Sequence, residues 1–332
     1  MTMHDGIVEQ ADRFKKKIAS RDTSSYKVVE PGQLVVGFPI DEGVIYVQNY
    51  PYPGIMSPAY NVWDINGDLI DPAYLELVLH GPKSMAYYAD KMRGTTARRR
   101  SLTADNLCAM RVPLPSLERQ RRVVHLFNTV KDEMVIAGRV VEALDQLVKS
   151  RFAEMFGDAG WPVATVGSLA VDVRYGTSKK ASDCGEYVYL RMNNMTDDGR
   201  LDLDDVKRID LNGPELEKCR VVDGDLLFNR TNSREKVGKT VVFHEREPMV
   251  IAGYIIRVRL GDRVRPDFLA TYMNLPTTKA MLRSIAKGAV HQANINSREL
   301  SAIEVPVPPM ELQDRFLSFA AEVDKSRFVV RS

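Results

Sequence analysis

The sequence has little cysteine and no long hydrophobic run. Its three cysteines, Cys108, Cys184 and Cys219, lie far apart and include no C-x-x-C pair. This argues against a disulfide framework or a cysteine zinc site, and indicates a reducing compartment. No stretch of about eighteen apolar residues is present, so no membrane span is expected. The N-terminal segment MTMHDGIVEQADRFKKKIAS has no apolar signal-peptide core. We therefore expect a soluble, cytoplasmic protein.

Neither sign of charge dominates. The 46 Lys and Arg stand against 44 Asp and Glu, which gives a net charge of +2. Such a balance neither demands nor excludes DNA binding, because what matters is whether the basic residues cluster on one face. With 332 residues, of which 44% are hydrophobic and 27% charged, the chain is long enough for two globular domains.

Motifs for catalysis are also missing. The glycine-rich nucleotide-binding fingerprint is absent, as is the Asn/Asp-Pro-Pro-aromatic tetrapeptide of methyltransferases that act on exocyclic amines. VGKT at 237–240 lacks the first glycine of a phosphate-binding loop, because Ser233 stands there. Asp267 has no Glu-x-Lys downstream, the five histidines show no metal-ligand spacing, and the acidic run at 202–205 is typical of a solvated turn. We expect no cofactor, no metal and no catalysis by this chain alone.

The sequence does contain an internal repeat. Residues 112–120 read VPLPSLERQ and residues 305–313 read VPVPPMELQ. Upstream, VVEPGQLVV around Gly32 matches VVDGDLLFN around Gly224, and the spacing to the proline segment agrees to within one residue. A third pair, GTTARRRSLTADNL and GAVHQANINSREL, lies between them in the same order. The chain is therefore predicted to be two copies of one unit.

Each copy ends in a proline-rich joint followed by a helix. No proline or strong breaker except Gly138 follows Glu118 until Gly157, which predicts a helix of roughly 58 Å at 1.5 Å per residue. Its apolar residues recur in alternating steps of four and three, which is a heptad seam. The second copy repeats the seam, so we expect the two helices to pack antiparallel, although two unrelated amphipathic helices are an alternative. The seam residues are Val123, Phe127, Val130, Met134, Ala137, Val141, Leu144 and Val148 in the first helix, and Leu312, Phe316, Phe319 and Val323 in the second.

Short strand patterns precede a helical segment in both copies. In the second copy GEYVYLRM, GDLLFNR, KTVVFHE and AGYIIRVRL are separated by turn residues, and DFLATYMNLPTTKAMLRSIAKG follows as one or two helices. The first copy has the same order. Strands followed by helices favour an α+β fold with two repeated mixed domains over a doubly wound sheet.

At this point the residues resemble a known family, the specificity subunits of type I restriction-modification enzymes. The resemblance is carried by the joint and helix VPLPSLERQRRVVHLFN, by FAEMFGD and WPVATVGSL after it, and by GAVHQANINSRELSAIEVPVPP. It implies two target-recognition domains that each read half of a bipartite DNA site. It also implies helices that hold these domains apart and dock two methyltransferase subunits, to which a motor-nuclease subunit can add.

The resemblance divides the chain into four parts. These are a first target-recognition domain at 1–113, a spacer helix at 114–157, a second recognition domain at 158–305 and a C-terminal helix at 306–332. The first domain is expected to be shortened, because only about half of the segment that opens the second copy has a counterpart before Gly32. This predicts a truncated or recombined variant, or a gene fragment.

Candidate DNA contacts form clusters of cations and amides, which suit phosphates and base edges respectively. The richest is NRTNSREKVGK after a strand, and a second, amide-rich cluster follows Gly288. The alternative for each cluster is an ordinary solvated loop. The predicted contacts are Arg98, Arg99, Arg100, Arg174, Tyr175, Lys179, Lys180, Arg191, Asn193, Arg230, Asn232, Arg234, Lys236, Lys239, Lys287, His291, Gln292 and Asn294.

Three hypotheses of function follow. The first is a non-catalytic subunit that reads double-stranded DNA and docks methyltransferase subunits. The second is a helix-mediated assembly or decoy protein that binds the methyltransferase or a second copy of itself without reading DNA. The third, a stand-alone transcriptional regulator, is weaker because no helix-turn-helix pattern stands out.

Overall fold

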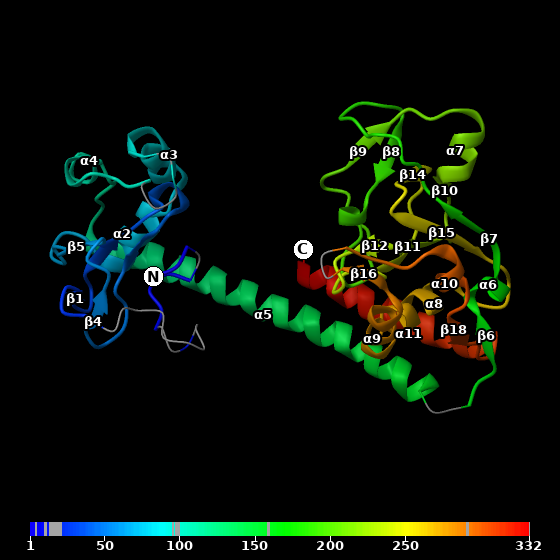
Figure 1. The fold of residues 1–332 in the computed structure, drawn as a ribbon. Coiled ribbons are helices and arrows are strands. Elements are labelled where there is room, and N and C mark those ends of the chain that lie inside the picture. The colour runs from blue at the N-terminus through cyan, green and yellow to red at the C-terminus, as the bar shows by residue number, and fades with distance from the viewer. Residues whose placement is uncertain are drawn as a thin grey trace. The chain divides into compact units, whose positions relative to one another are not determined.

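The computed structural model describes residues 1–3, 5–9, 12, 22–94, 96, 100–157, 160–289 and 292–331. The chain divides into two units, Met1–Val135 and Ile136–Ser332, and the division falls within one long helix, α5 (Leu117–Phe156) (Figure 1). No helix in the described parts of the chain is both long enough and apolar enough to cross a membrane.

Unit 1 is a small α+β domain. Three of its helices begin at residues that favour a helix start. Pro72 and Pro82 occupy the first turn of two of them, and Thr103 is the N-cap of a third. Its elements are β1 (Lys27–Val29), β2 (Leu34–Val36), the 3-10 turn η1 (Ile40–Glu42), β3 (Ile45–Val47), β4 (Gly54–Met56), β5 (Asn61–Trp63), α2 (Pro72–Leu79), α3 (Pro82–Lys91), α4 (Ala104–Cys108) and the first part of α5.

Unit 2 is a larger version of the same arrangement. Its first elements are β6 (Val163–Thr165), α6 (Val166–Leu169), β7 (Ala170–Tyr175), β8 (Tyr187–Leu190), the 3-10 turn η3 (Met192–Asn194), β9 (Lys207–Ile209), α7 (Gly213–Cys219) and β10 (Arg220–Val221). There follow β11 (Leu226–Asn229), β12 (Thr231–Asn232), β13 (Thr240–Val242), β14 (Met249–Ile251), β15 (Ile255–Leu260), α8 (Pro266–Met273), α9 (Pro276–Ile285), β16 (Lys287–Ala289), β17 (Gln292–Asn294), α10 (Ser297–Ser301), β18 (Glu304–Pro306) and α11 (Met310–Arg331).

The two units share a sheet topology. In unit 1 the central strand β2 lies between β3 and β5, and Leu34 pairs with Val47 and Trp63. In unit 2 the central strand β11 lies between β13 and β15, where Leu226 takes the place of Leu34. A second antiparallel pair, β1–β4, likewise matches β10–β14. Unit 2 extends these sheets with β7, β8 and β9. The predicted repeat and the α+β class are confirmed.

A buried glutamine fixes the start of the long helix in both units. In unit 1 the amide of Gln120 accepts a hydrogen bond from the Asp71 N–H (2.8 Å) and donates to the carbonyls of Leu69 (3.0 Å) and Pro115 (2.8 Å). The side chain is fully buried. A buried amide with all of these bonds made anchors the helix to the chain that enters α2.

Gln313 repeats the arrangement in unit 2. Its amide accepts from the Arg265 N–H (2.8 Å) and donates to the carbonyls of Pro308 (2.8 Å) and Arg263 (3.4 Å). Gln313 is also fully buried. The two glutamines are the same residue of the repeated ELQ and ERQ segments, so the duplication extends to individual hydrogen bonds.

Within unit 2, α11 packs antiparallel on the C-terminal part of α5. Arg327 near the end of α11 pairs with Asp145, whereas Phe316 near its start meets Phe152 at 5.2 Å between ring centroids. Residue numbers thus rise along one helix as they fall along the other. Phe152 and Phe156 are buried with Phe268 of α8. The predicted antiparallel pairing is correct for this part of the seam.

The N-terminal part of the seam differs from the prediction. Val123, Phe127, Val130 and Met134 are exposed at 42%, 53%, 47% and 71%, whereas Val141, Leu144 and Val148 are partly buried. The reason is the length of α11, which has 22 residues against 40 in α5. Its contacts with α5, such as Phe316 with Phe152 and Arg327 with Asp145, lie on the C-terminal part of α5.

Candidate nucleic-acid interface

Two polar segments that are far apart in the sequence meet in a small three-stranded sheet of unit 2. Strand β12 pairs antiparallel with β17, which also pairs with β16. In this register Thr231 lies opposite Asn294, and the Thr231 hydroxyl donates to the Asn294 side-chain oxygen at 2.8 Å. The NRTNSREKVGK loop and the amide-rich segment after Gly288 were predicted as separate clusters. The structure brings their described residues together.

Arg230 lies where β11 passes into β12. Its guanidinium carbon is 4.8 Å from the centroid of the Tyr175 ring, which is within the range of a cation–π contact. The Tyr175 hydroxyl is hydrogen-bonded to Ser297, the first residue of α10. Predicted contacts from two different clusters, Arg230 and Tyr175, therefore form one site.

The other cations of this region differ in how free they are. The Arg234 guanidinium donates to the main-chain carbonyls of Arg283, Ala286 and Gly288 at 3.3–3.4 Å, so it ties the loop to the end of α9. Lys236 is exposed. Lys287 is exposed but forms an ion pair with Glu299 at 2.6 Å. The backbone of Asn232 is paired with Ala293, Gln292 is exposed, and His291 lies outside the described residues.

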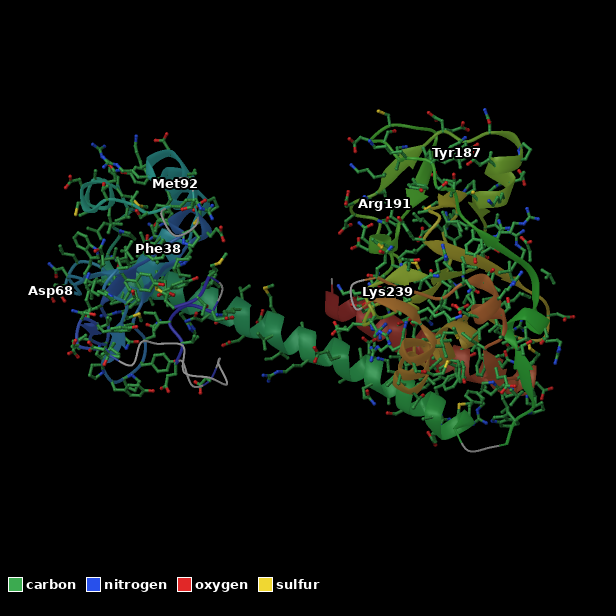
Figure 2. All side chains as sticks on the ribbon, viewed as in Figure 1. Phe38, Asp68, Met92, Tyr187, Arg191 and Lys239 are labelled. Atoms are coloured by element: carbon green, nitrogen blue, oxygen red, sulfur yellow. The ribbon has the colours of Figure 1, made fainter. Side chains whose placement is uncertain are left out.

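Lys239 has a structural position. It is only 9% exposed, and its ammonium donates to the Met195 carbonyl (2.9 Å) and pairs with Asp197 (2.9 Å) (Figure 2). The hydrogen bond from Lys239 lowers the pKa of the Asp197 carboxyl. An ammonium engaged in this way ties the 195–197 segment to β13 and has little left for a phosphate. Lys239, which was predicted as a DNA contact, is therefore a structural residue and not part of the candidate interface.

Cations around β7 are partly neutralised. Arg174 pairs with Asp172 (2.9 Å), which also pairs with the buried Arg257. Lys179 pairs with Glu215 and thereby lowers the pKa of that carboxyl. Lys180 is exposed.

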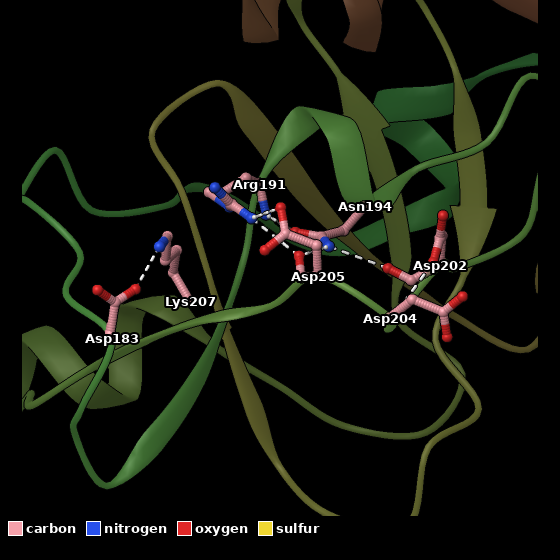
Figure 3. A network of polar contacts seen from close by, with 7 residues as sticks. All are labelled: Asp183, Arg191, Asn194, Asp202, Asp204, Asp205 and Lys207. Carbon is pink, nitrogen blue, oxygen red and sulfur yellow. Dashed lines mark hydrogen bonds and ion pairs between the residues drawn. The ribbon is translucent and has the colours of Figure 1, made fainter. Parts of the chain in front are cut away.

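The cluster around Arg191 forms a network of polar contacts (Figure 3). The Arg191 guanidinium donates to the Asp205 carbonyl (2.8 Å) and carboxylate (3.1 Å). The Asn194 amide donates to the carbonyls of Asp202 and Asp205, both at 2.9 Å. The acidic run thus forms a turn held by Arg191 and Asn194, while Asn193 remains exposed. Arg191 is largely committed to this turn, in contrast to Arg230.

The arginine patch of the first copy can be described only at Arg100, because Arg98 and Arg99 lie outside the described residues. The Arg100 guanidinium binds the carboxylates of Asp41 and Glu42, and the hydrogen bond to Glu42 raises the pKa of Arg100. These two carboxylates compete with any phosphate for Arg100.

One polar site was not foreseen. His244 lies in a 640 Å³ cleft of unit 2, with its two ring nitrogens 2.8 Å from the Asp223 carboxylate and 2.9 Å from that of Asp267. The hydrogen bond to Asp267, with a second to Asp223, raises the pKa of His244 to about 9. Both partners are more than twenty residues away in the sequence, so no local pattern could have revealed them. Among the described residues, no group of histidine, cysteine and carboxylate side chains could hold a metal ion.

No family model matches the chain, but individual proteins do. It is 26% identical over 168 residues to a protein of Methanocaldococcus jannaschii described as the specificity subunit of the type I restriction enzyme MjaX. The aligned residues cover 49% of this chain and 39% of that protein. It is 23% identical over 223 residues to the type I restriction enzyme EcoKI specificity subunit of Escherichia coli, covering 61% of this chain and 48% of that one. The chain is a homologue of type I restriction enzyme specificity subunits.

Other specificity subunits extend this relationship. The StySPI subunit of Salmonella potsdam is 22% identical over 267 residues, which cover 74% of this chain and 56% of that subunit. The chain thus spans about half the length of these homologous specificity subunits. The family resemblance suggested by the joint-and-helix pattern is confirmed.

Solved structures share the fold. A chain from a structure of a type I R-M system superposes with a TM-score of 0.59 at 20% identity, covering 93% of this chain and 78% of that one. The type I restriction-modification S subunit of M. genitalium gives a TM-score of 0.54 at 10% identity, covering 98% and 87%. The chain therefore shares its fold with these two structures.

Proposed function

We propose that the chain is a non-catalytic subunit that reads double-stranded DNA for a type I restriction-modification system. The observation that carries the proposal is the meeting of β12 and β17 beside Arg230, in a homologue of specificity subunits. This end of unit 2 gathers a stacked guanidinium, side-chain amides and exposed cations from separate segments, which is what base edges and phosphates require. In this proposal the chain acts in the cytoplasm.

The proposal assigns a role to each part of the chain. Residues 1–113 and 158–305 are two target-recognition domains. Residues 114–157 and 306–332 are helices that set the separation of the half-sites and dock the partners. Two methyltransferase subunits are the expected partners, and a motor-nuclease subunit can join them. The exposed apolar seam of α5 also suits self-association of the chain.

The test is co-expression with a type I methyltransferase subunit of the same genome, followed by single-molecule sequencing of methylated adenine in host DNA. The expected result is methylation at a split motif with a fixed, unspecified spacer. A stable complex that leaves the DNA unmethylated contradicts the proposal and favours the assembly or decoy alternative. A motif with only one specified half would mean that unit 1 no longer reads DNA.

A further inference from the structure

Main-chain hydrogen bonds to two other segments hold Arg230 in place. Its N–H donates to the Tyr254 carbonyl (2.9 Å), and its carbonyl accepts from the Ile295 N–H (2.9 Å). These bonds join β11 to the turn before β15 on one side and to the end of β17 on the other. The position of the Arg230 Cα is therefore fixed by three segments of unit 2.

The aromatic ring beneath Arg230 is also fixed. The Tyr175 hydroxyl donates to the Ser297 side-chain oxygen (2.9 Å) and accepts from the Ser297 N–H (2.7 Å). Reorienting the ring would break both bonds. Because the guanidinium lies 4.8 Å from the ring centroid, it rests on a rigid platform.

The charge of Arg230 is not neutralised within the described parts of the protein. Among the described residues its guanidinium donates one hydrogen bond, to the Gly253 carbonyl at the long distance of 3.5 Å, and its Nε is buried without a described partner. No carboxylate of the described residues lies within ion-pair distance of the Arg230 guanidinium. Many arginines of the same unit differ in this respect, since an aspartate pairs with each of Arg174, Arg191, Arg200, Arg257, Arg259 and Arg265.

We propose that Arg230 is a specificity-determining residue that reads a guanine in the major groove, and that Tyr175 and Ser297 are the residues that position it. This inference rests on the proposed function. Arginine bound to guanine O6 and N7 through two parallel hydrogen bonds is the commonest specific contact to DNA. A planar fork that is already immobilised loses less entropy when it forms these bonds. An exposed cation such as Lys236 is suited instead to phosphates.

The decisive variant is Arg230→Lys in the complex of full chain and methyltransferase. Lysine keeps the charge but lacks the planar fork. Binding to DNA that carries the methylation motif should fall about 5- to 150-fold, because a good bidentate pair discriminates by that factor. Binding to scrambled DNA should stay within about twofold. Methylome sequencing should show one guanine of the motif relaxed to other bases.

Two further variants sharpen the test. Tyr175→Phe keeps the ring and removes the hydroxyl, so it should reduce discrimination less than Arg230→Lys, and the double variant should add little to the latter. Lys236→Ala, in the same loop, is the matched control. It should weaken motif and scrambled DNA alike and lower the salt slope of binding by about one. The melting temperature of each complex checks that the fold is intact.

The outcomes are distinguishable. If Arg230→Lys weakens motif and scrambled DNA equally, or leaves the methylated motif unchanged, the role of Arg230 is refuted while the proposed function stands. If the wild-type complex itself shows no preference for any motif, the proposed function fails, and the inference fails with it.

Discussion

In unit 2 the groove between α8 and α11 is filled by Phe152 and Phe156 of α5, whereas the corresponding groove of unit 1 is open. The unit 1 groove has a volume of 840 Å³ and is lined by residues that include Tyr74, Pro113 and Phe127. Tyr74 corresponds in the repeat to Phe268, which meets Phe152 and Phe156 at 5.0 Å between ring centroids. Duplication has therefore reproduced the shape of the groove without reproducing what fills it.

A second difference lies beside the glutamine clamps. In unit 1 Arg121 of α5 is 3.9 Å from the Asp71 carboxylate, and in unit 2 Asp314 of α11 is 2.7 Å from the Arg265 guanidinium. The two pairs occupy the same positions of the repeat with the charges exchanged. The geometry of the joint is thus maintained while the side chains on its surface change.

The largest effect is expected from removing Phe152, an aromatic side chain that fills the groove of unit 2 and has no counterpart in the open groove of unit 1. Phe152→Ala should lower the free energy of unfolding of unit 2 by about 3–5 kcal/mol, because Phe152 is buried among other aromatic rings. Urea unfolding followed by circular dichroism measures the effect. Phe127→Ala in the open groove is the control, with an expected change below about 0.5 kcal/mol. Equal losses would show that the unit 1 groove is filled in solution.

The glutamine clamps should respond alike. Gln120→Ala and Gln313→Ala each leave main-chain groups without partners in a buried joint, so each should cost about 1–3 kcal/mol of unfolding free energy. Loss of the same magnitude in both variants supports equivalence of the two joints. A cost at only one of them would mean that the shared hydrogen bonds do not have a shared energetic role.

His244 should make the stability of unit 2 depend on pH. Its pKa is raised to about 9 by Asp267 and Asp223, so the stabilisation is complete below pH 6.5 and is lost as the pH rises through about 9. The expected loss is about 1 kcal/mol, well below the full linkage value, because the imidazole is 55% exposed and solvent screens the pairs. In unit 1, β3 is followed by Gln48 and Asn49 rather than a histidine.

The measurement is urea unfolding at several pH values for wild type and His244→Asn. The variant should be less stable than wild type at neutral pH and should lose the part of the pH dependence between pH 6.5 and about 9. An unchanged profile would show that another group is responsible.

The smallest effect is expected from the exchanged ion pair. Arg265→Asp should cost about 0.2–1 kcal/mol, because Arg265 and Asp314 are each about half exposed. Arg265→Asp combined with Asp314→Arg recreates the polarity of unit 1 and should recover most of that cost. A double-mutant cycle measures the coupling. No recovery in the double variant would mean that the polarity at this position is not interchangeable.

The repeat and its joints could be predicted from sequence because proline and glycine act locally. Pro113 and Pro306 precede helices at matched positions, and Gly32 and Gly224 both adopt φ of +83° in the turns before their central strands. The heptad pattern predicted a partner helix but not how far it extends along α5. That depends on the length of α11, which the periodicity of α5 does not encode.

The candidate interface was only partly predictable. Clusters of basic residues were visible, but whether a cation is free depends on carboxylates that are distant in sequence. Lys239 meets Asp197 and Arg100 meets Asp41, in both cases across more than forty residues. The stack of Arg230 on Tyr175 depends likewise on two strands brought together by the sheet. Composition identified the candidates, and tertiary structure distinguished among them.

The glutamine clamps have a consequence for how such chains can evolve. The side chains of Gln120 and Gln313 bind main-chain groups, both at the start of α2 or α8 and in the joint before their own helix. These bonds do not depend on the side chain at the start of α2 or α8, which is Asp71 in one unit and Arg265 in the other. A domain exchanged at this joint, by recombination between related genes or by protein engineering, would present the same main-chain groups to the glutamine. The hydrogen bonds of the joint would then form without further substitutions. At such a joint one unit could be exchanged for another while the helix that follows it stays as it is.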